Sequence, residues 1–139
     1  MISRFYSANL IGAALRGSCF VASSKLSEPQ VLRISVGFNT TNELTVSIDS
    51  YHRFAAPYNC STAAVVNTED ALAMARRHRI DFAELPSFIA DCMARWRRSP
   101  SMGRGQVLRC FKEITEKLLD ERCRFRIVRT TGLKDSICC

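Results

Sequence analysis

Residues 32–38 read Leu-Arg-Ile-Ser-Val-Gly-Phe, and residues 44–49 read Leu-Thr-Val-Ser-Ile-Asp. In both segments an apolar residue alternates with a polar or small one, which predicts two strands that each have one buried and one solvent-facing side. The residues between them, Asn39-Thr-Thr-Asn-Glu43, are of types that suit a turn. The sequence therefore predicts a β-hairpin here, which can extend to Phe54 before Pro57 ends it.

Helical patterns follow the hairpin. After one more short apolar segment, at 62–66, apolar residues recur at helical spacing over about 68–79, 86–98 and 106–121, with charged residues on the opposite side. Asn67 or Thr68 suits the N-cap of the first of these helices, and Pro86 suits the first turn of the second. The sequence therefore predicts a third short strand and then about three helices.

A second alternating stretch, Arg122-Cys-Arg-Phe-Arg-Ile-Val-Arg129, comes after the helices. It predicts a strand whose Cys123, Phe125 and Ile127 face inward while its arginines face solvent. Strands followed by helices and a returning strand indicate an α+β fold. We expect a small antiparallel sheet, made of the N-terminal hairpin and the C-terminal strand, with about three helices packed on one face.

The length of 139 residues suits a single domain, which we place at 28–132, followed by a flexible tail at 133–139. Residues 1–27 carry no acid but contain Arg4, Arg16, Lys25 and several serines, a composition found in mitochondrial transit peptides. An ordinary N-terminal segment is the alternative. A secretory signal fits less well, because the apolar stretch at 8–15 is short and Arg16 follows it at once.

The seven cysteines include no Cys-x-x-Cys motif and no histidine at ligand spacing, so we expect no metal site. Their odd number and irregular spacing favour a reducing, intracellular compartment, which is mitochondrial if residues 1–27 are a transit peptide, over secretion. No glycine-rich loop indicates a cofactor. No apolar run approaches the ~20 residues of a membrane-spanning helix, so integral membrane association is not expected.

The net charge is +7, with 20 Lys+Arg against 13 Asp+Glu, and arginine far outnumbers lysine. Arginine forms fixed bidentate contacts with phosphate and carboxylate groups, so a row of arginines suits a polyanion. The competing interpretation is a solvated surface whose arginines pair with nearby acids. Trp96 falls on an apolar helix stripe, which favours burial over base stacking. The candidate nucleic-acid-binding residues are Arg122, Arg124, Arg126 and Arg129 on the strand and Arg95, Arg97, Arg98 and Arg104 around the loop before the third helix.

Three functions follow from these patterns. The first is a basic, non-enzymatic protein that binds a polyanion or nucleic acid, more plausibly RNA than a DNA site because no recognition helix or zinc module is visible. The alternative is a protein–protein interaction module, such as a complex subunit or regulatory adaptor with an acidic partner. An unrecognised enzyme with Cys60 as nucleophile and His52 or His78 as base ranks last, because no catalytic signature surrounds these residues.

Overall fold

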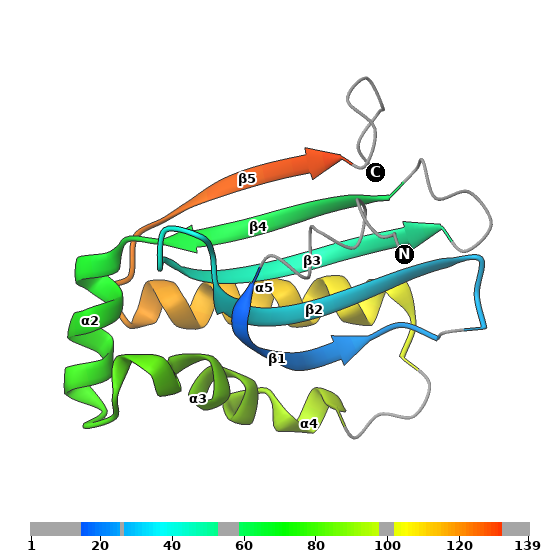
Figure 1. Cartoon of the computed structure of the whole chain (residues 1–139). Coiled ribbons are helices and arrows are strands. Elements are labelled where there is room, and N and C mark those ends of the chain that lie inside the picture. Colours follow the sequence, from blue (N-terminus) through cyan, green and yellow to red (C-terminus); the bar gives the residue numbers. More distant parts are fainter. Residues whose placement is uncertain (1–14, 26, 53–58, 98–101, 132–139) are drawn as a thin grey trace.

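A computed structural model of the protein describes residues 15–25, 27–52, 59–97 and 102–131. Within them the chain forms a five-stranded antiparallel sheet with the strand order β1-β2-β3-β4-β5 (Figure 1). The strands are β1 (Arg16–Ser23), β2 (Gln30–Phe38), β3 (Leu44–His52), β4 (Cys60–Val66) and β5 (Phe125–Thr131).

The helices of the described residues all lie between β4 and β5 in the sequence. They are α2 (Thr68–Arg77), the short 3-10 helix η2 (Phe82–Glu84), α3 (Leu85–Cys92), α4 (Ala94–Arg97) and α5 (Arg104–Asp120). The predicted α+β class, with helices on one face of an antiparallel sheet, is therefore confirmed (Figure 1). In the described part of the chain, no helix is both long and apolar enough to cross a membrane.

The predicted hairpin is formed by β2 and β3, which pair without interruption from Gln30 opposite His52 to Phe38 opposite Leu44. Its turn is held by Asn39, whose Oδ1 accepts hydrogen bonds from the backbone N–H of Thr41 at 3.1 Å and of Glu43 at 2.8 Å. Because an asparagine side chain can satisfy turn amides in this way, the turn sets the register of both strands.

The core lies between the sheet and the helices. α3 and α5 both lie against β1 and β2, and apolar side chains at alternate strand positions meet the apolar stripes of the helices. Residues that are almost fully buried in this layer include Ile34, Val36, Leu44, Val46, Ala64, Leu85, Ile89, Val107, Ile114 and Leu118.

The first strand was not expected. β1 lies within residues 1–27, which the sequence placed outside the domain, yet it pairs antiparallel with β2. Its register shifts between Arg16 and Cys19 and again between Phe20 and Ala22, so the neighbouring residues Val21 and Ala22 are both buried. Irregular pairing of this kind removes the period-two pattern by which a strand is recognised.

Gly37 in β2 lies directly under the irregular part of β1. A Cβ atom at this position would come within 2.9 Å of the Arg16 carbonyl oxygen and 3.0 Å of the Ser18 Cα, both of which are backbone atoms. Backbone cannot move aside as a flexible side chain can, so β1 approaches β2 this closely only because residue 37 has no side chain.

We expect Gly37→Ala to lower the free energy of unfolding by about 1–3 kcal/mol, because the added methyl group forces β1 away from β2. Gly105→Ala is the matched control, since nothing lies within 4 Å of a Cβ there and alanine suits a helix better than glycine by about 0.5–1 kcal/mol. Urea unfolding followed by circular dichroism measures both. Equal stability of the two variants would contradict the close approach of β1.

Candidate binding site around strand β5

Strand β5 lies at one edge of the sheet, and its arginines do not form a single row. The strand begins at Phe125, three residues later than predicted, because Arg122 has a left-handed backbone (φ 62) in the turn after α5. Arg126 lies opposite Val65 on the face of the sheet that carries none of the described helices, called the helix-free face below, whereas Arg129 lies opposite Thr62 on the face toward the helices. The expected row is therefore limited to Arg124 and Arg126.

Both of these arginines are paired with carboxylates. The Nε of Arg124 donates to Asp70 Oδ2 at 2.9 Å, and the backbone N–H of Arg124 donates to the same oxygen at 2.9 Å. Arg126 donates to both carboxylate oxygens of Glu43, each at 3.1 Å. Bidentate charged hydrogen bonds of this kind stabilise both charged forms. In the competing interpretation of the sequence, the arginines pair with nearby acids. The structure shows such pairing for Arg124 and Arg126.

The pairing shifts the protonation of the acids. Hydrogen bonds from Arg126, then from Asn39 and Thr41, lower the pKa of Glu43 from 4.5 to about 2. Hydrogen bonds from the side chain and backbone of Arg124 also lower the pKa of Asp70. Both acids are therefore carboxylates at neutral pH, and each neutralises one arginine.

An open depression of about 680 Å³ lies next to these pairs, at the start of α2. Its lining includes Arg124 and Arg126 but also Glu43 and Glu69. The charges of two arginines and two glutamates cancel, so the depression does not present the excess positive charge that an anion-binding site needs.

The second group of predicted residues lies elsewhere. α4, which carries Arg95, lies near β1, at the opposite edge of the sheet from β5 (Figure 1). Arg95 pairs with Glu113, and Arg104 donates to Gln30 Oε1 at 3.0 Å. Arg98 and the side chain of Arg97 lie outside the described residues. The described members of the two groups are thus not brought together on one surface.

Trp96, which the sequence assigned to the core, is half-buried. It packs against the core, and its Nε1 donates to Glu113 Oε1 at 3.2 Å. The ring is also flanked by the Arg95 guanidinium, 5.5 Å from its centre. An indole held in this way is not a free platform for base stacking.

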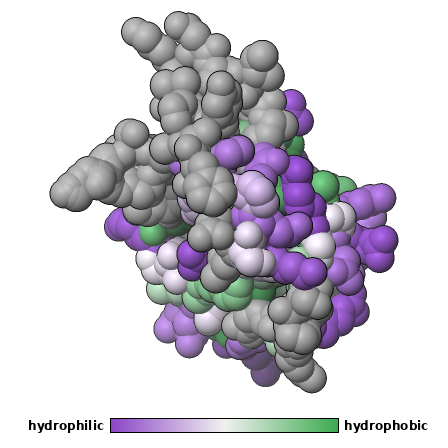
Figure 2. Space-filling view, turned by 90° about the vertical axis from the view of Figure 1, so that its right-hand side faces the viewer, coloured by the Kyte–Doolittle hydropathy of each residue, from purple (hydrophilic) through white to green (hydrophobic). Residues whose placement is uncertain are grey.

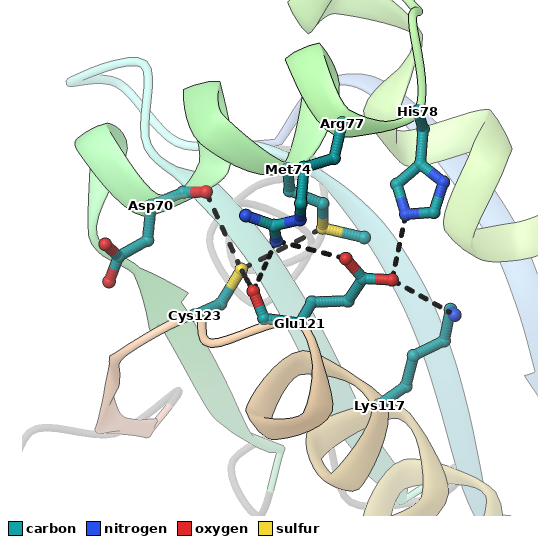
Figure 3. Close-up of polar contacts among 7 residues, drawn as sticks. All are labelled: Asp70, Met74, Arg77, His78, Lys117, Glu121 and Cys123. Carbon is teal, nitrogen blue, oxygen red and sulfur yellow. Dashed lines mark hydrogen bonds and ion pairs between the residues drawn. The ribbon is translucent and has the colours of Figure 1, made fainter.

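A polar cluster fixes the turn that leads into β5 (Figure 3). Glu121, at the C-terminal end of α5, bonds to His78 Nε2 at 2.8 Å and to Arg77 at 3.1 Å, and Lys117 lies 3.7 Å away. Burial raises the pKa of Glu121, but the hydrogen bonds from His78 and Arg77 outweigh this effect and the pKa is lowered. The cluster therefore joins the C-terminal ends of α2 and α5 through a carboxylate.

A buried polar network on the helix-free face was not predicted from the sequence. Ser47 Oγ donates to Asp49 Oδ1 at 2.8 Å and lies 2.9 Å from Ser61 Oγ, and all three residues are buried. Burial raises the pKa of Asp49. Alternation along β3 correctly placed Ser47 and Asp49 on the face away from the helices but predicted that they face solvent. No pattern in the sequence indicated their burial.

The residues of the enzyme hypothesis do not form a catalytic group in the described structure. Cys60 is disulfide-bonded, so its sulfur is not a free thiolate, whereas Cys19, Cys92, Cys110 and Cys123 are free. His78 is bound to Glu121, as described above. Among the described residues, no three His, Cys, Asp or Glu side chains are grouped so that they could hold a metal ion.

Comparisons with known proteins add no identification. No protein family, no curated protein and no solved structure matches this chain. Function must therefore be argued from the geometry of the surface alone.

Glu43→Gln tests the Arg126 pair. The folded pKa of about 2 lies below the ordinary value of 4.5, so the carboxylate contributes stability above about pH 4.5, and this contribution is lost as the pH falls through about 2. We expect the variant to be less stable at neutral pH by at most about 1 kcal/mol, because the pair is near solvent and screened. The difference from the unmutated protein should vanish near pH 2.

Urea unfolding at a series of pH values measures this effect. Glu116→Gln serves as control, because it removes an exposed carboxylate that forms no ion pair within the described part of the chain. A stability difference for Glu43→Gln that does not change with pH would show that the carboxylate charge is not what matters.

Proposed function

We propose that the protein is an interaction module that binds an acidic protein partner through β5 and the neighbouring surface of α5. The proposal rests on the location of the large apolar side chains that are exposed. At the end of the molecule seen in Figure 2 the described surface is mainly hydrophilic. Five large apolar side chains are exposed among the described residues, and four of them lie on α5 or β5: Leu108, Leu119, Ile127 and Val128.

The position of β5 supports the same proposal. Among the described strands none pairs with its outer edge, so its outward N–H and C=O groups are free of strand partners. Ile127 is 49% exposed and Val128 is 39% exposed, on opposite faces of the strand. An edge strand with exposed apolar side chains invites association and is usually protected by charges. Here Arg126, the charge before Ile127, is already neutralised by Glu43.

The charges indicate an acidic partner. Arg122, just before β5, and Arg129, within it, are exposed and form no ion pair within the described residues. A phosphate chain would have to replace Glu43 and Asp70 on Arg126 and Arg124. Each exposed pair is weak because solvent screens it, but the displaced carboxylates would stay beside the phosphates and repel them. A protein partner can use the free arginines and the apolar side chains instead.

Affinity capture from native lysate tests the proposal. We expect the double variant Ile127→Asp with Val128→Asp to retain at most a tenth of the captured partner, because it places charge on both exposed faces of β5. Arg109→Glu is the control, since it makes the same change in net charge on the solvent side of α5. Circular dichroism checks that each variant is folded.

Nuclease treatment of the lysate separates the two functions. The proposal expects the captured partner to survive nuclease and to be retained by the control. Capture that is unchanged by the double variant would overturn it. Capture that nuclease abolishes would point to nucleic acid instead.

One observation favours RNA binding as a second candidate. Phe20 in β1 is 41% exposed on the helix-free face, and the Arg33 guanidinium lies 5.2 Å from the centre of its ring. Both residues point to the same side, because Phe20 pairs with Ser35, two residues along β2 from Arg33. An exposed aromatic ring with an adjacent arginine is the type of platform on which single-stranded bases stack.

Fluorescence anisotropy with a labelled single-stranded RNA measures this candidate. Loss of a stacking ring costs about 1–3 kcal/mol, so Phe20→Ala should weaken binding about 5- to 150-fold, and binding should fall steeply with added salt. Arg76→Ala, an exposed arginine on α2, is the charge control. RNA affinity that is the same for Phe20→Ala as for the unmutated protein would exclude this site.

A further inference from the structure

One side of α5 carries a stripe of residues that the described part of the chain leaves largely exposed. Leu108, Lys112, Thr115 and Leu119 follow one another at helical spacing and so share a side of the helix. Leu108 is 52% exposed and Leu119 is 60% exposed. A helix in a globular protein normally has one apolar face, and α5 already uses Val107, Cys110, Ile114 and Leu118 for the core. The exposed leucines therefore form a second apolar surface.

The contacts of α5 show where this stripe points. On the other side of the helix, Glu113 pairs with Arg95 of α4. Glu121, which caps the end of α5, pairs with Arg77 and with His78, the last residue and the C-cap of α2. That side faces the other helices. The stripe lies on the opposite side of the core face, so it points toward the half of the sheet that contains β4 and β5.

At the edge of the sheet in the same region, the helix side of β5 is left partly exposed by the described residues. Four spacings of about 4.8 Å make the sheet about 19 Å wide, and two helices of about 10 Å each could cover it. However, α3 and α5 both lie against β1 and β2, so the helical layer is displaced toward β1 (Figure 1). Ile127 projects from β5 to the helix side, because it pairs with the buried Ala64, yet it remains 49% exposed.

These two uncovered elements form what we call the α5–β5 face, made of Leu108, Lys112, Thr115 and Leu119 on α5 and Ile127 and Arg129 on β5. Its apolar residues lie along a helix and beside a strand on the same side of the sheet. A further helix lying next to α5 would continue the helical layer over β5 and bury them.

The two charged residues of the α5–β5 face are both cations. Lys112 lies within the stripe, and Arg129 lies on the same side of β5 as Ile127. Neither forms an ion pair with the described residues. A second copy of this chain would bring these cations toward their own equivalents, which costs energy when the charges become desolvated. An acidic occupant would pair with them instead.

We propose that the α5–β5 face binds an amphipathic α-helix of a partner protein, with the apolar side of that helix against Leu108, Leu119 and Ile127 and its acidic flanks beside Lys112 and Arg129. This inference rests on the proposed function and adds the form of the partner. Docking of a helix by anchors one and two turns apart is a common mode of recognition, and here the anchors would enter between α5 and β5.

The probe is a synthetic peptide of about the length of α5, with leucines at heptad a and d positions and glutamates on the flanks. Two matched peptides replace the glutamates by lysines or interrupt the helix with a central proline. Binding to the full chain, labelled with nitrogen-15, is followed by amide chemical shifts and by isothermal titration. We expect shifts at residues 108–119 and 127–129, and affinity at least about tenfold higher for the acidic helical peptide than for either control peptide.

Single substitutions then locate the contact. Leu119→Asp and Lys112→Glu should each weaken binding at least about tenfold. Arg109→Glu should leave it unchanged, because Arg109 is exposed on α5 outside the stripe and its replacement makes the same change in net charge as Lys112→Glu. Positions 109, 112 and 119 are all exposed, so the variants are expected to fold, and their amide spectra verify it.

Three results would overturn the inference. They are the absence of shifts at the α5–β5 face with the acidic helical peptide, equal binding of all three peptides, and a dimer in solution that Leu119→Asp dissociates, which would make a second copy the occupant. The proposed function has a separate outcome. If Ile127→Asp with Val128→Asp abolishes capture of the partner while Leu119→Asp does not, the module stands and the helix-binding face fails.

Discussion

The arrangement of the candidate surface depends on how α5 is joined to α2. All helices of the described residues are inserted between β4 and β5, so the chain must return from the end of α5 to the edge of the sheet. Glu121, held by Arg77, His78 and Lys117, fixes the end of α5 against the end of α2. Just beyond it, the backbone N–H of Asn67 donates to the Arg124 carbonyl at 2.8 Å, which aligns the start of β5 with the end of β4. A half-buried carboxylate in contact with the side chains of Arg77, His78 and Lys117 therefore helps to fix where the edge strand begins.

The regular spacing of apolar residues in the sequence predicted those strands and helices that have one buried and one exposed face. The β2–β3 hairpin and the helices α2 and α5 follow this rule, and each begins and ends within a few residues of its expected bounds. β1 was not predicted, because its register shifts twice and its adjacent residues Val21 and Ala22 are both buried. The helix expected at 86–98 is divided into α3 and α4 at Met93, for which the sequence contains neither proline nor glycine as a signal. Local regularity is readable in a sequence, whereas irregular pairing depends on neighbours distant in the chain.

The candidate site was less predictable because its properties depend on distant partners. Alternation along residues 122–129 indicated an extended segment, and that is correct from Phe125 onward. It carried no information that Glu43, more than eighty residues earlier, would pair with Arg126, or that Asp70 would pair with Arg124. In the same way, Ser47 and Asp49 alternate as solvent-facing residues would, yet they are buried beside Ser61. Charge and alternation show which side chains share a face, but only the fold shows what lies against that face.

Neutralisation of the paired arginines changes what the positive charge of the chain can be used for. A net charge of +7 on a small domain suggests a surface for a polyanion. Arg124 and Arg126 are occupied by internal acids, and Arg122 and Arg129 are the two arginines of residues 122–129 that form no ion pair with the described residues. They lie beside exposed aliphatic residues. Apolar contact area bordered by isolated charges is the usual composition of a protein–protein interface, in which burial supplies most of the affinity and the charges select the partner.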